Sequence, residues 1–334
     1  MKISVLSPPE IALPVKGYGG IEKIAYDLYR ELARKHDARI YGSGSAAIPY
    51  PYDYDFDLMI DFTHEKRVPK NASKQNYISV PFLTDNLSHV NDVFPSRAVR
   101  DGFNADGRII YPGIDPSPYR YSRQHDDYLL FLGRISVIKR PHVAIQVARM
   151  LGMKCIIAGH TGKYASFPDS GYVNMIRHLC NISDGLCSIV EEPGEEEKVS
   201  LLSNAKCVII PSDWSIIGSM ESFGIVAVEA LLSGKPCIVS HDGGLKEIVT
   251  EETGFVCSTL DEYVNAIKKI DSIDSSKCRE RGLYFTSERY AEELLSSLHG
   301  SNAGRGNGTC SLGSQAKSYA CEHCSSLPGG VPLS

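Results

Sequence analysis

Two glutamates stand beside a glycine-led apolar run in the segment ESFGIVAVEALLSGKPCIVS (221–240). Glu221 lies in the loop after a predicted strand, whereas Glu229 lies inside a helix that we expect to begin near Phe223 and Gly224. Their spacing keeps the two carboxylates off a single helix face, so they suit two ends of an extended ligand. The free N–H groups at that helix N-terminus suit a phosphate, and carboxylates accept hydrogen bonds from sugar hydroxyls.

Two cations follow an earlier apolar run. Arg134 and Lys139 stand in LLFLGRISVIK (129–139), just after the run ends. A diphosphate that leaves in a reaction needs cations or hydrogen-bond donors to stabilise its charge. These two side chains and the helix dipole can supply that charge, so we expect no metal and no cofactor.

Five blocks resemble, in order, the retaining glycosyltransferases of family 4, which have the GT-B fold. Glu221-x7-Glu229 resembles the EX7E signature of that family, and Arg134 to Lys139 resembles its GR-x4-K segment. The other blocks are KGYGGIEKIAYDLYREL (16–32), IIYPGID (109–115), in which Pro112 replaces the usual Asn, and FTSERYAEELLSSL (285–298). The resemblance covers about residues 1–298.

The resemblance implies roles for matching positions. Glu221 would contact the donor sugar, Glu229 the ribose, and Arg134 and Lys139 the diphosphate. The implied donor-binding set is Gly19, Gly20, Arg134, Lys139, Glu221, Phe223, Gly224, Ile225 and Glu229, and the implied catalytic set is Glu221, His64, Arg134 and Lys139. His64 falls near an active-site histidine of relatives, and the alternative is an ordinary surface histidine.

Three further features have a functional and a structural interpretation. His160 could contact the nucleotide or belong to a structural loop, and Glu191 or Glu192 could border the nucleobase. The acidic run EEPGEEEK (191–198) suggests a metal site, but a simpler interpretation is that Glu195 to Glu197 occupy the first turn of a helix and complement its dipole. The basic cluster Lys66, Arg67, Lys70 and Lys74 is either a solvated loop or a contact with a lipid-phosphate acceptor or an anionic membrane surface.

Strand-like apolar runs alternate with helical patterns along most of the chain, which predicts two doubly wound α/β domains facing across a cleft. Predicted strands are 2–7, 38–43, 57–62, 76–81, 108–113, 127–133, 154–159, 187–192, 207–212 and 236–241. Predicted helices are 21–34, 141–151, 195–205, 224–233, 244–250 and 285–298. The expected parts are an acceptor-side domain (1–118), a nucleotide-sugar domain (119–283), a closing helix that returns to the first domain (284–299) and a disordered or appended tail (300–334).

Composition narrows the class of protein. With 43% hydrophobic and 22% charged residues the chain is an ordinary globular protein, and its net charge of −5 argues against a nucleic-acid partner. It shows neither a signal peptide nor an apolar run of about 20 residues, which favours the cytoplasm. Core cysteines such as Cys155 and Cys207 read as reduced and buried. Cys310, Cys321 and Cys324 of the tail are either inert or half of a zinc site.

The favoured function is therefore transfer of a hexose, with retention, from a UDP- or GDP-sugar to a sugar, lipid-linked or small-molecule acceptor. A nucleotide-sugar epimerase, a phosphorylase of similar shape and a non-catalytic nucleotide-sugar binding protein are alternatives. A phosphorylase would need a cofactor-lysine motif, which we do not find. A dehydrogenase is disfavoured because Glu22 occupies the place of the third glycine in GxGxxG.

Overall fold

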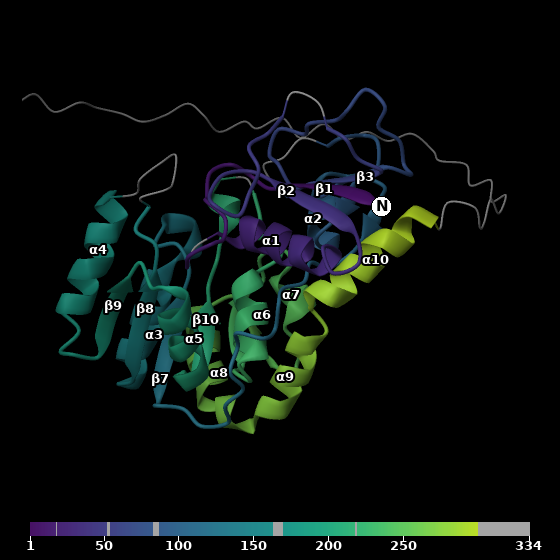
Figure 1. Cartoon of the computed structure of the whole chain (residues 1–334). Helices are drawn as coiled ribbons and strands as arrows, with labels where there is room; N and C mark the ends of the chain where they lie inside the picture. The colour runs from purple at the N-terminus through teal and green to yellow at the C-terminus, as the bar shows by residue number, and fades with distance from the viewer. Residues whose placement is uncertain (18, 52–53, 83–86, 163–169, 218, 300–334) are drawn as a thin grey trace, which may run out of the picture. The chain divides into compact units, whose positions relative to one another are not determined.

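The structure is a computed structural model that describes residues 1–17, 19–51, 54–82, 87–162, 170–217 and 219–299 (Figure 1). Residues 1–300 form one compact unit. The predicted tail and its three cysteines lie outside the described residues. None of the helices within the described ranges is long and apolar enough to cross a membrane.

The first half of the chain forms a four-stranded sheet in the order β2-β1-β3-β4, and every pairing in it is parallel. All four strands were expected from their apolar runs, and β3 and β4 are buried along their whole length. The strands are β1 (Lys2–Leu6), β2 (Asp37–Tyr41), β3 (Leu58–Asp61) and β4 (Tyr77–Ser79). A separate pair of short parallel strands is formed by β5 (Val93–Phe94) and β6 (Arg108–Ile109).

The second half forms a six-stranded parallel sheet in the order β12-β11-β10-β7-β8-β9. Five of its strands match predicted runs, and β12 was not predicted. The strands are β7 (Tyr128–Leu132), β8 (Lys154–Gly159), β9 (Cys187–Glu191), β10 (Cys207–Ile210), β11 (Cys237–Ser240) and β12 (Gly254–Cys257).

Helices complete both parts (Figure 1). Of the ten α-helices in the described ranges, α2, α4, α8 and α9 were not predicted. The α-helices are α1 (Gly20–Leu32), α2 (Arg97–Gly102), α3 (Pro141–Leu151), α4 (Ser170–Asn181), α5 (Glu195–Asn204), α6 (Ile225–Leu232), α7 (Leu245–Ile248), α8 (Leu260–Lys268), α9 (Ser275–Leu283) and α10 (Ser287–His299). Short 3-10 turns are η1 (Val137–Lys139), η2 (Trp214–Ile217) and η3 (Ile270–Ser272).

Side chains of the six-stranded sheet alternate between two cores, as the pleat requires. Leu129 and Phe131 point into a core shared with α3, α4 and α8. Leu130 and Leu132 point into the other core, which includes residues of α5 and α6. The sheet is therefore covered on both faces, which explains why its strands are nearly continuous apolar runs.

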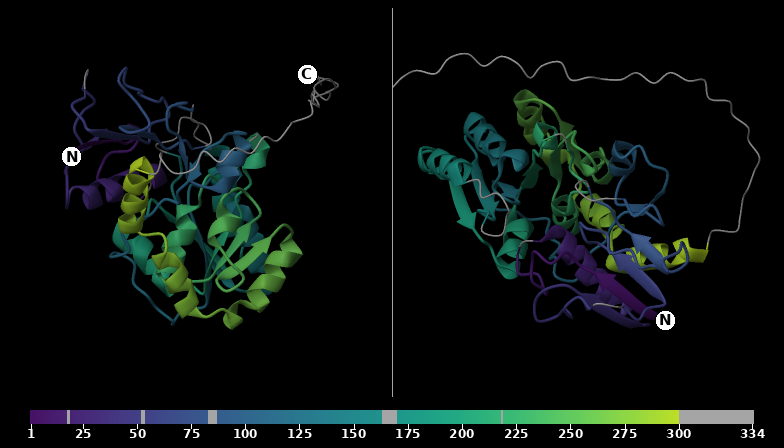
Figure 2. Two further views of the ribbon diagram at one scale, coloured as in Figure 1. Left: turned by 90° about the vertical axis from the view of Figure 1, so that its right-hand side faces the viewer. Right: turned by 90° about the horizontal axis from the view of Figure 1, so that it is seen from above.

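The two sheets are joined by contacts between distant segments. Helix α10 packs against α1, as the views in Figures 1 and 2 also show. Glu247 of α7 accepts hydrogen bonds from the backbone N–H groups of Arg97 and Ala98 at the start of α2 (3.0 and 2.9 Å). A carboxylate at that position satisfies two free donors and complements the helix dipole. These contacts tie helices α1 and α2 of the first half to α10 and α7 of the second half.

Ending the chain after His299 is expected to leave the fold intact, whereas ending it before Tyr284 is expected to unfold it. The shorter chain loses Phe285, Tyr290 and Leu294, each 0% exposed. Burying such a side chain contributes about 1.5–3 kcal/mol, and a whole domain is stable by only about 5–15 kcal/mol. Thermal melts of residues 1–299, residues 1–283 and the full chain test this. Unfolding of the 1–299 chain, or release of stoichiometric zinc from the full chain, would overturn the domain map.

Candidate functional site

The predicted helix of the ESFG segment is α6, and Gly224 caps its N-terminus in a left-handed conformation (φ 98°). A Cβ at Gly224 would lie 2.4 Å from Leu245 Cδ2, so only glycine fits there. No side chain of the described residues caps this helix start. Its first N–H groups therefore remain available to an anion.

Glu221 is buried just before α6, and three donors hold its Oε2 oxygen. Ser212 Oγ donates at 3.0 Å and Trp214 Nε1 at 3.3 Å, and the Lys139 ammonium forms an ion pair with the same oxygen. Burial alone would raise the pKa of Glu221, but Lys139 and the two neutral donors hold it below its ordinary value. The carboxylate is therefore charged at neutral pH.

The structure thus brings Lys139 and Glu221 together, as expected of two residues of one site. The two side chains form an ion pair with each other, which was not predicted. Lys139 Nζ also lies 5.0 Å from the centre of the Trp214 ring, a cation–π contact. Trp214, the one tryptophan of the chain, was not predicted as a site residue. Its position in a polar loop directly before the glutamates was the available signal.

Glu229 is buried within α6, and two donors hold its Oε1 oxygen. Tyr119 Oη donates at 2.7 Å and Lys198 Nζ at 3.0 Å. Burial opposes the charge of Lys198, but Glu229 and Glu195 raise its pKa above the ordinary value, so it is protonated. Burial and the neighbouring Glu229 charge raise the pKa of Tyr119, which keeps its hydroxyl a donor.

The two glutamates share one arrangement. Each is fixed through a single oxygen, Oε2 in Glu221 and Oε1 in Glu229. Within the described part of the chain, the second oxygen of each carboxylate receives no hydrogen bond. An oriented carboxylate with one oxygen available is suited to accept hydroxyl protons from a ligand.

The glycine loop of the first half reaches the same place. Gly19 caps α1 with a φ of 133°, and a Cβ on Gly20 would lie 3.3 Å from Ile225 Cγ2. The N-terminal ends of α1 and α6 therefore meet. The backbone N–H of Gly17 donates to Glu195 Oε1 of α5 (3.3 Å). Phe223 is buried against Phe285, so only its backbone is available to a ligand.

Arg134 follows β7 and is half-buried. Its Nε is buried and has no hydrogen-bond partner among the described residues. An unpartnered buried guanidinium nitrogen is costly, and an anionic ligand would satisfy it.

His64 lies close enough to Glu22 for their charges to interact. Burial raises the pKa of Glu22 to about 7, and His64 opposes part of that rise. Glu22 stands in the first turn of α1, beside Gly19, with 6% exposure. The sequence pattern marks Glu22 only as the residue that breaks a dinucleotide motif.

The weaker sequence candidates have structural partners. His160 forms an ion pair with Glu192, which also accepts hydrogen bonds from Thr161 N (3.0 Å) and Oγ1 (2.9 Å). Glu191 is paired with Arg177. These contacts fix the loops at the carboxyl ends of β8 and β9.

The basic cluster divides into two pairs. Lys66 Nζ donates to the carbonyls of Thr63 (2.7 Å) and Val80 (3.1 Å), and Arg67 stacks on the Tyr50 ring. Lys70 and Lys74 are exposed.

The described residues include the core cysteines and the side chains that could bind a metal. Cys155, Cys180, Cys187, Cys207, Cys237, Cys257 and Cys278 are free thiols and buried, as expected for the core cysteines. No group of three or more His, Cys, Asp or Glu side chains in the described ranges is placed to hold a metal.

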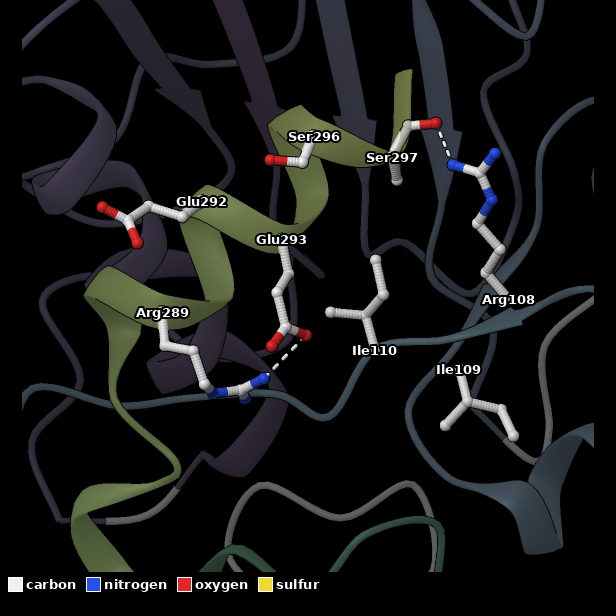
Figure 3. Close-up of a pocket in the computed structure, with 8 residues that line it drawn as sticks. All are labelled: Arg108, Ile109, Ile110, Arg289, Glu292, Glu293, Ser296 and Ser297. Atoms are coloured by element: carbon white, nitrogen blue, oxygen red, sulfur yellow. Dashed lines mark hydrogen bonds and ion pairs between the residues drawn. The ribbon is translucent and has the colours of Figure 1, made fainter. Parts of the chain in front are cut away.

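An open groove of about 700 Å³ lies elsewhere, between α10 and β6 (Figure 3). Its two arginines are engaged by its own wall: Arg289 pairs with Glu293 at 2.8 Å, and Arg108 donates to the Ser297 carbonyl. None of the predicted site residues lines it. The predicted site is therefore defined by side-chain contacts and not by this groove.

Parts of this chain are similar in sequence to known glycosyltransferases. Residues 121–282 match the family model described as Glycosyl transferases group 1. A D-inositol 3-phosphate glycosyltransferase of Corynebacterium glutamicum (strain R) is 30% identical over 208 residues, which is 58% of this chain and 48% of that protein. An alpha-1,3/1,6-mannosyltransferase of Dictyostelium discoideum is 35% identical over 140 residues, 38% of this chain and 32% of that protein. The chain thus spans about half or less of the length of these curated relatives.

Solved structures show the same fold. A glycosyltransferase of avilamycin A biosynthesis, AviGT4, superposes with a TM-score of 0.74 at 22% identity, covering 90% of this chain and 97% of that one. The Anabaena protein Alr3699/HepE, solved with UDP and glucose, superposes with a TM-score of 0.66 at 18% identity, covering 90% and 99%. The predicted fold class, mixed α/β with two Rossmann-like halves as in GT-B glycosyltransferases, is confirmed.

Proposed function

We propose, because residues 121–282 match the family model described as Glycosyl transferases group 1, that this chain moves a hexose from a UDP- or GDP-sugar to an acceptor hydroxyl with retention. The observation that supports this most is the pair of glutamates before and within α6, a helix whose N-terminal end meets that of α1, with each glutamate held through one oxygen. The UDP-bound state of Alr3699/HepE supports a nucleotide donor. The acceptor is a sugar, a lipid-linked group or a small molecule.

The residues have the following proposed roles. Glu229 accepts hydrogen bonds from the ribose hydroxyls, and Glu221 accepts them from the donor sugar. Arg134, Lys139 and the α6 N-terminus neutralise the diphosphate, so the reaction proceeds without a metal. Without a ligand, Lys139 is paired with Glu221 and lies over the Trp214 ring.

The proposed reaction is a front-face displacement. The bond between the anomeric carbon and the diphosphate oxygen breaks, and the acceptor oxygen forms a new bond on the same face. The acceptor proton passes to the departing diphosphate oxygen, so no protein nucleophile is needed. Gly19 and Gly20 let the α1 loop approach the transferring sugar, and His64 lies at the same end of the first sheet for contact with it.

Titration of UDP- and GDP-sugars, followed by an assay for slow donor hydrolysis, tests the proposal. We expect binding of one nucleotide class and slow hydrolysis that survives EDTA, because protein cations take the place of a metal. Complete loss of hydrolysis with EDTA, restored by Mn²⁺ or Mg²⁺, would contradict the metal-independent mechanism. Binding without hydrolysis or transfer would favour a nucleotide-sugar binding protein, and epimerised donor would favour an epimerase.

A further inference from the structure

Lys198 occupies an unusual position for a lysine that follows an acidic run. It belongs to the first turns of α5 and is only 3% exposed. Its Nζ donates to Glu195 Oε1 at 2.9 Å and to Glu229 Oε1 at 3.0 Å. A buried ammonium is tolerated only when such partners compensate for lost hydration.

Glu195 connects this lysine to the first half of the chain. The Glu195 Oε1 that accepts from Lys198 also accepts from the backbone N–H of Gly17, at 3.3 Å. A Cβ on Gly17 would lie 2.5 Å from the Pro193 carbonyl oxygen, so the close approach of the loop depends on glycine. Contacts therefore run without interruption from Gly17 through Glu195 and Lys198 to Glu229.

Tyr119 completes the restraint from the segment between the two sheets. Its hydroxyl donates to Glu229 Oε1 at 2.7 Å, so two donors from different segments share one oxygen. Two such bonds fix the rotation of the carboxylate and the direction of Oε2. Neither donor competes for Oε2, which the rest of the described chain also leaves without a hydrogen bond.

We propose that Lys198 is a positioning residue that orients Glu229 toward the ribose hydroxyls and, through Glu195, couples this orientation to the glycine loop at Gly17. The inference rests on the proposed function, because it needs Glu229 to bind ribose. It adds a residue whose cation acts through the glutamate and does not touch the ligand. Donor affinity then depends on the position of the glycine loop at Gly17 as well as on the residues that contact the ligand.

The test compares Lys198→Met, Lys198→Arg and the control Lys206→Met. Lys206 is also a largely buried lysine with an ion pair, to Asp271 at 2.7 Å, but it lies away from the site. The ligands are UDP and 2′,3′-dideoxy-UDP, or the guanosine pair if GDP is the nucleotide that wild type binds. Calorimetry gives Kd, and donor hydrolysis gives KM and kcat separately.

Wild type is expected to bind UDP about 10- to 150-fold more tightly than the dideoxy form, the value of a charge-assisted hydrogen bond. Lys198→Met should lose most of that preference and raise the KM for donor, with a smaller change in kcat. Lys198→Arg should recover part of the preference because it keeps the charge, and Lys206→Met should behave as wild type. If Lys198 had only a structural role, its substitution would leave the ratio of the Kd values for UDP and the dideoxy form unchanged.

If Lys198→Met folds and keeps the full preference for UDP over the dideoxy form, the inference is wrong. If Lys198→Met does not fold, Glu195→Gln serves instead: it keeps the shape, weakens the hold on Lys198 and Gly17, and should reduce the same preference. An unchanged preference in Glu195→Gln would likewise overturn the coupling. If wild type binds neither UDP nor GDP, the proposed function itself fails, an outcome distinct from these.

Discussion

Glu229→Ala is expected to weaken binding of the nucleoside diphosphate by about 10- to 150-fold, even without acceptor. The lost interaction is a charge-assisted hydrogen bond in a closed site, worth roughly 1.5–3 kcal/mol. Arg134→Ala should act in the same direction, because it removes a guanidinium proposed to face the diphosphate. The measurement is Kd for UDP or GDP by calorimetry, with Glu280→Ala, an exposed glutamate of α9, as the control.

Stability must be separated from affinity in this experiment. Removing the Glu229 carboxylate leaves Lys198 with only Glu195, and breaking a buried ion pair costs about 3–5 kcal/mol. Glu229→Gln keeps an acceptor for Tyr119 and Lys198 and is therefore the second variant. Nucleotide affinity unchanged in both Glu229→Gln and Arg134→Ala would contradict the ribose and diphosphate assignments.

The framework of the site could be predicted from local sequence. Continuous apolar runs indicated the parallel strands, and Gly224 marked the start of α6 because no other residue fits its conformation there. The ends of those strands and helices then had to lie together at the carboxyl edge of the second sheet. That Glu221 and Glu229 share this edge follows from their short separation along the chain.

The partners of these glutamates could not be predicted in the same way. Tyr119 and Glu229 are 110 residues apart, and Lys139 and Glu221 are 82 residues apart, so no local pattern joins them. Lys198 directly follows the acidic run at 195–197, and only the packing of α5 against α6 shows that it is buried. Charge type alone does not reveal burial, because a paired lysine can be enclosed.

Helix α9 was missed for a related reason. It is strongly polar, and only Cys278 and Gly282 within it are buried. Its place is set by a close approach in which a Cβ on Gly282 would lie 2.6 Å from the Leu232 backbone nitrogen. Such a contact depends on the tertiary arrangement. The polar sequence of α9 itself offers little apolar periodicity to detect.

Glu221→Gln is expected to reduce kcat by about 10- to 150-fold while leaving affinity for the nucleoside diphosphate nearly unchanged. Glu221 precedes the helix whose N-terminus is proposed to bind phosphate, so its available oxygen should reach the sugar. Hydrogen bonds there matter most as the glycosyl group gains positive character in the transition state. Glutamine keeps the size and one acceptor oxygen but removes the charge.

The ion pair seen in the structure sharpens this expectation. Lys139 is paired with Glu221, so neutralising Glu221 frees the ammonium for the diphosphate instead of removing it. Nucleotide affinity should therefore hold steady or rise, the opposite of Glu229→Ala. Asp213→Asn is the matched control, because Asp213 lies in the same loop but pairs with Arg140 at 3.0 Å. If Glu221→Gln loses nucleotide affinity as strongly as Glu229→Ala, the division between sugar and ribose is wrong, and if its turnover equals that of Asp213→Asn, Glu221 is only a structural residue of the loop.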